Sequence, residues 1–129
     1  MSEIRTIKTR TGSVARGVAD IIIMRFDDDV ILEPADIIEI NVACSELCNK
    51  QKLPHLVVTG LRMSVTPEAR AVDIIDSRVE NTLCEALIIN NLATRMAARL
   101  YYKFNKVPFE VKHFKTENEA LQWIRVNYL

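Results

Sequence analysis

Two short, mostly apolar runs separated by helix-like segments place the tightest limit on how this chain can fold. The runs are "HLVVTG" at residues 55–60 and "CEALIIN" at residues 84–90. Continuous apolar runs of this length are typical of strands that are covered on both faces, as in a parallel sheet. Parallel neighbours need a crossover connection, which is usually a helix. The two runs therefore predict an α/β protein.

The rest of the chain fits the same alternating order. Residues 3–9 and about 14–26 are rich in β-branched residues on either side of Gly12, which predicts an antiparallel hairpin. Helices are expected over residues 33–52, 66–76, 91–106 and 115–129, and a last strand over residues 108–114. The order β-β-α-β-α-β-α-β-α predicts one mixed, mostly parallel sheet that has right-handed crossovers and is covered by helices.

Two of the expected helices begin with clear capping signals. Thr66 stands directly before Pro67, so we expect Thr66 to be the N-cap and the proline to occupy the first helical position. Thr116 and Glu119 form the T-x-x-E pattern of a capping box ahead of the last helix. These signals predict where the two helices begin.

A basic stripe lies on the helix expected over residues 91–106. Arg95, Arg99 and Lys103 recur every four residues, so their charged groups lie along one side of the helix. This stripe could hold a carboxylate, a phosphate or an acidic partner helix. The simpler interpretation is a solvated face opposite an apolar series that packs on the sheet, because a helix in a soluble domain needs a polar side. That apolar series consists of Leu92, Met96, Leu100 and Phe104.

Length and charge narrow the class of protein. With 129 residues, the chain is predicted to be one domain that spans residues 1–129. Its 17 Lys and Arg residues balance its 17 Asp and Glu residues, which argues against nucleic acid as a partner. The N-terminal residues lack the apolar core of a signal peptide, and no run approaches the ~18 apolar residues of a membrane span. We therefore expect a cytoplasmic protein with no integral membrane segment.

The cysteines favour the same compartment. Cys44, Cys48 and Cys84 cannot all pair with one another, and their apolar neighbours are typical of reduced core thiols. Cys44 and Cys48 are four residues apart on an expected helix and, together with His55 or His113, could be imagined as metal ligands. No repeated C-x-x-C or H-x-x-x-H pair completes such a set, so we expect no metal and no cofactor.

The sequence lacks the motifs of well-known enzyme classes. The turns after the expected strands have no glycine-rich phosphate loop, and no serine stands in a G-x-S-x-G elbow. Asp27, Asp28 and Asp29 lack the ligand spacing of a Ca²⁺ loop and fit a solvated turn. His113 fits a core or sheet-edge histidine better than a catalytic one. We expect no enzyme and no catalytic residue.

Two passages carry a family resemblance. The first is the strand-Asn-helix passage at residues 86–104. The second is a packing pattern formed by Phe114, Ala120, Leu121, Trp123 and Ile124. Together with the order of elements, they make roughly residues 18–127 resemble the small bacterial STAS domains of the SpoIIAA-like kind, which are similar to anti-sigma-factor antagonists. This group also borders the CRAL-TRIO lipid-binding fold. The resemblance implies a STAS/SpoIIAA-like domain.

In the regulatory members of this group, the resemblance implies a phosphorylatable Ser or Thr at the start of the helix that follows the central strand. That position corresponds to Ser64 or Thr66 in this chain. A phosphate there would meet unpaired backbone N–H groups, with Arg62 and Arg70 close in sequence. The passage lacks the D-S-S-G-type motif of the group, and Thr66 also fits a plain N-cap.

These observations lead to two functional expectations. The first is a non-enzymatic regulatory domain that presents a surface to a protein partner and leans toward a homodimer. Its candidate interaction or anion-binding residues are Arg62, Arg70, Arg95, Arg99 and Lys103. The alternative is a small lipid- or metabolite-binding carrier of the CRAL-TRIO-like type, with the ligand between the sheet and its helices. The short chain favours the first, since it has little volume to hollow out without losing core contacts.

Overall fold

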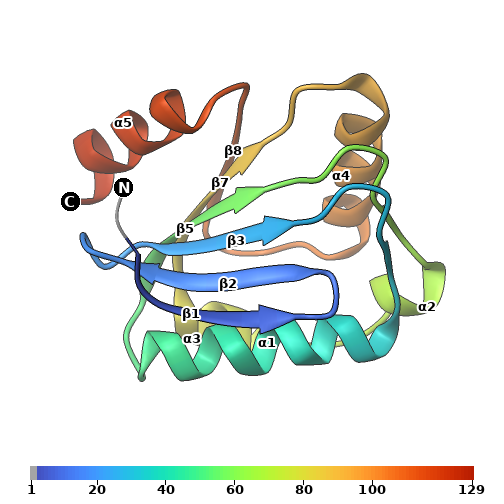
Figure 1. The fold of residues 1–129 in the computed structure, drawn as a ribbon, viewed down its shortest axis with the longest axis horizontal. Coiled ribbons are helices and arrows are strands. Elements are labelled where there is room, and N and C mark those ends of the chain that lie inside the picture. Colours follow the sequence, from blue (N-terminus) through green and yellow to red (C-terminus); the bar gives the residue numbers. More distant parts are fainter. Residues whose placement is uncertain (1–2) are drawn as a thin grey trace.

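A computed structural model describes residues 3–129, with side chains described from residue 5 onward (Figure 1). The strands are β1 (Glu3–Thr9), β2 (Gly12–Gly17), β3 (Ile22–Phe26), β4 (Ile31–Leu32), β5 (Leu53–Val58), β6 (Ser64–Val65), β7 (Thr82–Ile88) and β8 (Glu110–Phe114). The helices are α1 (Pro34–Cys48), α2 (Pro67–Arg70), α3 (Ile75–Asn81), α4 (Leu92–Phe104) and α5 (Glu117–Tyr128).

Within the described residues, six of the strands form one sheet in the order β1-β2-β3-β5-β7-β8. The first three strands pair antiparallel, and β3, β5, β7 and β8 pair parallel. The mixed, mostly parallel sheet that the sequence predicts is confirmed. The short strands β4 and β6 form a separate parallel pair just beyond β3 and β5, which the sequence patterns do not predict.

The opening of the fold differs from the predicted hairpin. The segment expected to be one strand over residues 14–26 is divided into β2 and β3 by a tight turn. In this turn the Gly17 N–H donates to the Ile21 carbonyl at 2.8 Å, and Asp20 has a φ of 57°. Asp tolerates this left-handed conformation better than most residues. The chain therefore begins with a three-stranded antiparallel meander.

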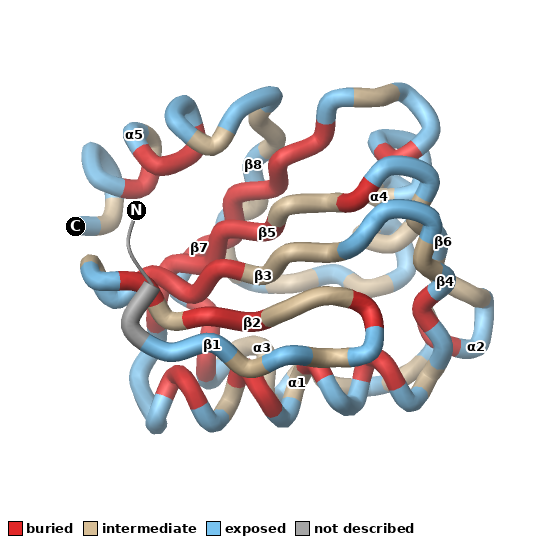
Figure 2. The backbone as a smooth tube through the Cα atoms, viewed as in Figure 1, coloured by how far each residue is buried: buried red, intermediate tan, exposed pale blue. Residues whose placement is uncertain are grey.

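The central strands have two buried faces. On β5, Leu56 packs on the face that α5 covers, while Val57 points to the opposite face. On β7, Ala86 and Leu87 divide in the same way. Figure 2 shows these strands as largely buried. Burial on both faces explains why β5 and β7 appear in the sequence as continuous apolar runs.

The helices divide unevenly between the two faces. α5 covers one face (Figure 1). Its Leu121 and Ile124 side chains belong to the same apolar cluster as Leu56. On the other face, α1 packs against β1, β2 and β3, while α4 contacts the far half of the sheet through Ala98 and Tyr102. The middle of this second face therefore lies between two helices. None of the described helices has the length and apolar content that crossing a bilayer requires.

The helix predicted over residues 66–76 is divided in two. α2 ends at Arg70, and α3 begins at Ile75, where the Asp73 carboxylate accepts a hydrogen bond from the Ile75 N–H at 3.2 Å. A local side-chain bond of this kind competes with a continuous helix. Arg78 lies on α3, and its side chain is only 13% exposed.

The prediction that the apolar series of α4 faces the sheet is wrong. Exposed fractions are 71% for Leu92, 60% for Met96, 40% for Leu100 and 68% for Phe104. The side of α4 toward the sheet carries smaller and more polar groups, including Thr94, Ala98 and Tyr102. The Tyr102 hydroxyl donates to Glu85 on β7, and this bond orients the helix. The spacing of apolar residues in the sequence cannot by itself show which side of an amphipathic helix meets the core.

Truncations on α5 and α4 test this orientation. Ile124→Ala removes a fully buried side chain, so it should lower the free energy of unfolding by about 2–5 kcal/mol. Met96→Ala removes an exposed side chain and should change it by no more than about 0.5 kcal/mol. Urea unfolding measures both. Equal losses for the two variants would place the apolar series of α4 in the core.

Candidate functional site

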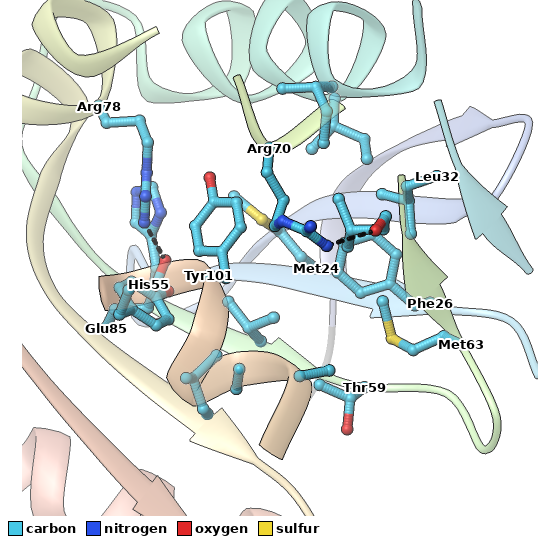
Figure 3. Close-up of a pocket in the computed structure, with 18 of the residues that line it drawn as sticks. Met24, Phe26, Leu32, His55, Thr59, Met63, Arg70, Arg78, Glu85 and Tyr101 are labelled. Atoms are coloured by element: carbon cyan, nitrogen blue, oxygen red, sulfur yellow. Dashed lines mark hydrogen bonds and ion pairs between the residues drawn. The ribbon is translucent and has the colours of Figure 1, made fainter. Parts of the chain in front are cut away.

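A pocket of about 300 Å³ lies between the sheet and the helices that cover its second face (Figure 3). Met24, Val57 and Leu87 of the central strands contribute to its lining, and α1 and α4 contribute on either side. This volume is at the lower end of the range for small-molecule sites. The expectation that so short a chain has little volume to hollow out is wrong, because α1 and α4 cover separate halves of the face. We call this space the α1–α4 pocket.

A buried ion pair forms one polar part of the α1–α4 pocket. Arg78 on α3 contacts Glu85 on β7 at 2.9 Å, and their side chains are only 13% and 4% exposed. The second carboxylate oxygen of Glu85 accepts from the Tyr102 hydroxyl, so both oxygens have partners. Burial is the largest single effect and opposes the charge of Arg78, but the charge of Glu85, the interaction with Tyr101 and the hydrogen bond to Glu85 together outweigh burial and raise the pKa of Arg78.

Aromatic rings hold the Arg78 guanidinium in place. Its central carbon lies 5.9, 5.8 and 5.4 Å from the ring centres of Tyr101, Tyr102 and Phe109, respectively. Guanidinium groups at such distances are attracted to ring faces. Burial raises the pKa of the Tyr101 hydroxyl, so this group is neutral at physiological pH. The ion pair and its rings form a neutral, rigid end of the α1–α4 pocket.

Arg70 supplies a second cation to the α1–α4 pocket. Figure 3 shows its side chain extending toward Met24 and Phe26. One nitrogen, Nη1, donates to the Val65 carbonyl at 3.0 Å. The described residues include no carboxylate that pairs with Arg70. Thr94, which also lines the pocket, has a buried hydroxyl with no hydrogen-bond partner among the described residues. The α1–α4 pocket is therefore mostly apolar, with one unneutralised cation and one free hydroxyl.

The structure places the two candidate phosphoacceptors next to each other but in different settings. Ser64 is exposed on β6 and borders the α1–α4 pocket. Thr66 is the N-cap of α2, and its hydroxyl accepts from the Ala69 N–H at 3.1 Å. The predicted cap is confirmed. Phosphorylation at either hydroxyl stays a prediction.

The two arginines expected near a phosphate have separate roles in the structure. Arg62 adopts a left-handed backbone conformation and forms an exposed, bidentate pair with Asp29. Arg70 lines the α1–α4 pocket. The sequence singled out Arg70 as a candidate anion-binding residue, and this role stays a prediction; the pocket that Arg70 lines was not predicted from the sequence.

The basic stripe of α4 is on the surface. Arg95, Arg99 and Lys103 are exposed, and the described part of the chain offers them no ion-pair partner. The pKa of His113, on the edge strand β8, is lowered mainly by burial and also by the positive charges of Arg95 and Arg99. His113 is therefore a half-buried, neutral sheet-edge histidine at pH 7, in line with the structural role that its sequence position favours.

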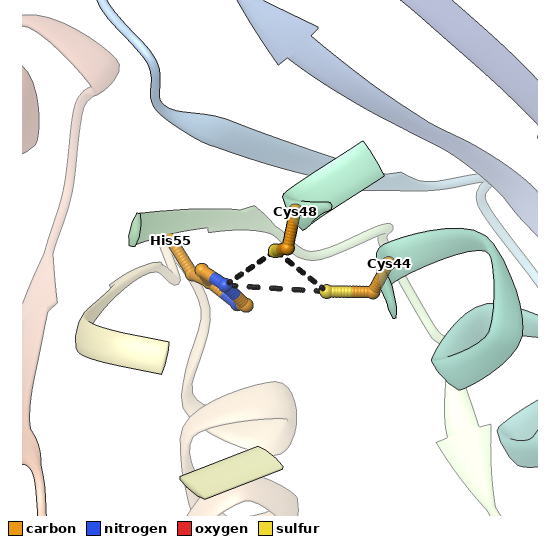
Figure 4. Close-up of side chains that lie close together, drawn as sticks. All are labelled: Cys44, Cys48 and His55. Carbon is orange, nitrogen blue, oxygen red and sulfur yellow. Dashed lines mark hydrogen bonds between the residues drawn. The ribbon is translucent and has the colours of Figure 1, made fainter. Parts of the chain in front are cut away.

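Two cysteines at the C-terminal end of α1 and a histidine on β5 lie close together (Figure 4). Cys44 Sγ and Cys48 Sγ are 4.0 Å apart, and each lies 3.9 Å from His55 Nε2 on β5. Cys84, in contrast, is buried on the α5 side of the sheet, and all three cysteines are free. The pKa of the Cys44 thiol is raised, mainly by its hydrogen bond with Cys48 and also by burial. The pKa of the Cys48 thiol is lowered, mainly by its hydrogen bond with Cys44 and also by its hydrogen bond with His55.

Sequence reasoning missed the ion pair of the α1–α4 pocket, which Arg78 and Glu85 form together with Tyr102. Glu85 carried the available signal, because it is a carboxylate within an apolar strand run and must find a partner there. Its partner Arg78 precedes it by seven residues, and its partner Tyr102 follows it by seventeen. No local pattern connects three such positions.

Comparisons with known proteins agree with this fold. Residues 17–127 match the model of a family described as a domain of unknown function (DUF7793). Among solved structures, the chain is similar to an uncharacterized protein of the DUF3478 family from Shewanella loihica PV-4, which has a SpoIIAA-like fold. The two share 14% identity over 92% of this chain and 90% of that chain, with a TM-score of 0.56. The predicted SpoIIAA-like fold is confirmed. No curated protein matches the chain.

Replacing Arg78 tests the buried ion pair. Arg78→Met leaves a buried carboxylate with only Tyr102 as its partner, so the free energy of unfolding should fall by about 3–5 kcal/mol. Adding Glu85→Met should recover much of the loss. Arg62→Met, which breaks an exposed pair, is the matched control and should cost about 0–1 kcal/mol. Similar losses for Arg78→Met and Arg62→Met in urea unfolding would contradict this assignment.

Proposed function

Because this chain belongs to the DUF7793 family, a domain of unknown function, we propose its function from the α1–α4 pocket. It is a non-enzymatic binding domain that holds a small, mostly apolar molecule with one anionic group. The single observation that carries this proposal is the 300 Å³ pocket, in which apolar walls surround an unneutralised arginine.

The apolar lining supplies most of the affinity in this proposal. Each buried methylene of a ligand contributes about 0.8 kcal/mol, so a chain of about six contributes roughly 5 kcal/mol before the costs of association. Phe26 and Thr59 stand at the carboxyl ends of β3 and β5 and line the pocket. This edge is where open α/β sheets commonly bind ligands. The pocket thus has both the chemistry and the position of a ligand site.

Arg70 selects the anionic group of the ligand. Arg78 is already neutralised by Glu85, whereas Arg70 bonds to a backbone carbonyl and retains further N–H donors. A carboxylate or similar anion can accept from those donors with charge assistance. The free hydroxyl of Thr94 offers an additional hydrogen bond to the same ligand. A neutral hydrocarbon would leave both groups unused.

A non-enzymatic role is part of the proposal. Both carboxylate oxygens of Glu85 already have partners, one in Arg78 and one in Tyr102, so this carboxylate is not positioned to act on a bound molecule. The described residues that line the pocket include no serine or cysteine paired with a histidine at the short distance of an activated nucleophile. Their arrangement favours holding a molecule.

The fluorescent probe 8-anilinonaphthalene-1-sulfonate tests the proposal, because it combines apolar rings with one sulfonate. The folded protein should bind it with enhanced fluorescence. Ala98→Phe fills the pocket and should weaken binding at least tenfold, and Arg70→Met should weaken it several-fold. Ala93→Phe is the matched control, since Ala93 is exposed on the same helix and does not line the pocket.

Two outcomes would contradict a ligand-binding function for the α1–α4 pocket. One is that the folded protein does not enhance the fluorescence of the probe. The other is that Ala98→Phe and Ala93→Phe bind the probe equally well. Circular dichroism of each variant confirms that the protein is folded during the measurement.

The outer face of α4 favours a second candidate function, a regulatory domain that binds a protein partner. Its exposed apolar series runs beside Arg95, Arg99 and Lys103, and α4 contains no acidic residue. Exposed apolar surface next to basic side chains is typical of an interaction site. A second copy of the chain would bring like charges together, so an acidic partner fits this surface better. This is the kind of role that anti-sigma-factor antagonists perform.

Crosslinking in the native host followed by mass spectrometry tests this second function. Crosslinks from the protein to an acidic partner should disappear when Met96 and Phe104 are both replaced by Ser. The matched control is Ile38→Ser with Val42→Ser, which removes two exposed apolar residues of α1. Identical crosslinks in the two double variants would exclude the outer face of α4 as the binding surface.

A further inference from the structure

The cluster of Cys44, Cys48 and His55 has the geometry of a metal site. The three donor atoms form a nearly equilateral triangle with sides of 4.0, 3.9 and 3.9 Å. A point at the centre of this triangle is about 2.3 Å from each atom, which matches the Zn–S bond length and is slightly longer than a Zn–N bond. A cation can therefore contact all three donors after shifts of only a few tenths of an ångström.

The local structure holds these donors in place before any metal binds. Cys44 and Cys48 are one helical turn apart on α1, so their side chains lie on the same face of the helix. His55 projects toward them from β5, and all three residues are buried. Figure 4 shows the imidazole and the two thiols converging from these two elements. Ligands that are already positioned lose little conformational freedom on binding.

The surroundings provide both a fourth position and a route of entry. The Asn81 carbonyl oxygen lies 2.9 Å from His55 Nε2 and 3.7 Å from Cys48 Sγ, next to the triangle. Cys44, His55 and Asn81 also line the α1–α4 pocket, so a cation can reach the donors from that side. Sites with three protein ligands commonly complete a tetrahedron with a water molecule or substrate.

The donor set determines which cations fit. Thiolates and imidazole prefer soft or borderline metals such as Zn²⁺, whereas Mg²⁺ and Ca²⁺ prefer oxygen ligands. We propose that Cys44, Cys48 and His55 form a Zn²⁺-binding site at the C-terminal end of α1. The cation binds both cysteines as thiolates, so any proton that either thiol carries passes to solvent. The imidazole proton moves from Nε2, which faces Asn81, to Nδ1, so Nε2 is free to bind the cation.

This site is independent of the ligand proposed for the α1–α4 pocket, and its test uses the metal alone. Titration of the reduced protein with Co²⁺ should give one equivalent of bound metal, with the near-ultraviolet charge-transfer absorption of a thiolate–cobalt complex. Zn²⁺ should displace the Co²⁺, and a pH indicator should record the release of protons as the metal binds. A failure of this titration leaves the probe-binding result untouched, and the reverse also holds.

Three variants and one matched control locate the site. Cys44→Ser and Cys48→Ser should each abolish the charge-transfer absorption or weaken Co²⁺ binding at least tenfold. His55→Gln keeps an N–H that can donate to the Asn81 carbonyl but removes the imidazole ligand, so it should also weaken binding at least tenfold. Cys84→Ser removes an equally buried thiol from the opposite face of the sheet and should bind Co²⁺ like the unmodified protein.

The wild-type titration alone can overturn the proposal, whatever happens to the stability of the variants. Absence of one-equivalent binding with thiolate absorption in the folded, reduced protein would show that the cluster is only hydrogen-bonded packing. Unchanged absorption in both Cys44→Ser and Cys48→Ser would assign the metal to other residues and would equally exclude this site.

Discussion

A buried carboxylate on β7, next to the edge strand of the sheet, governs the arrangement on one side of this molecule. Glu85 lies on β7 among apolar neighbours, where an unpaired charge would be strongly destabilising. Its partners are Arg78 from α3 and Tyr102 from α4, so one side chain connects two helices to the central strand. The position of α4, and therefore the shape of the α1–α4 pocket, follows from this requirement.

The two faces of the sheet have different physical roles. On the α5 face, Ala120, Leu121 and Ile124 pack closely onto the strands and form a continuous apolar cluster. On the other face, α1 and α4 contact separate halves of the sheet, and the space between them is the α1–α4 pocket. A short domain can contain such a space because the close packing on the opposite face supplies a complete core of its own.

The same tie to Glu85 explains the unusual surface of α4. With Tyr102 directed inward, Leu92, Met96 and Phe104 point to solvent, whereas Leu100 is partly exposed and also lines the α1–α4 pocket. The SpoIIAA-like fold by itself does not decide which ligand or partner uses these features, because function resides in sites that a fold carries. In this chain the sites are the α1–α4 pocket, the outer face of α4 and the thiol–imidazole cluster.

The sequence alone determined the elements whose signals are local. The apolar runs predicted β5 and β7 because both faces of a central strand are buried, and Thr66 and Thr116 predicted helix starts because capping bonds span only three residues. Only the tertiary structure decided the inward side of α4, the division of β2 from β3, and the meeting of Arg78, Glu85 and Tyr102. These features depend on contacts between residues that are distant in the chain, or on a turn hidden within a β-branched run, and neither leaves a periodic pattern.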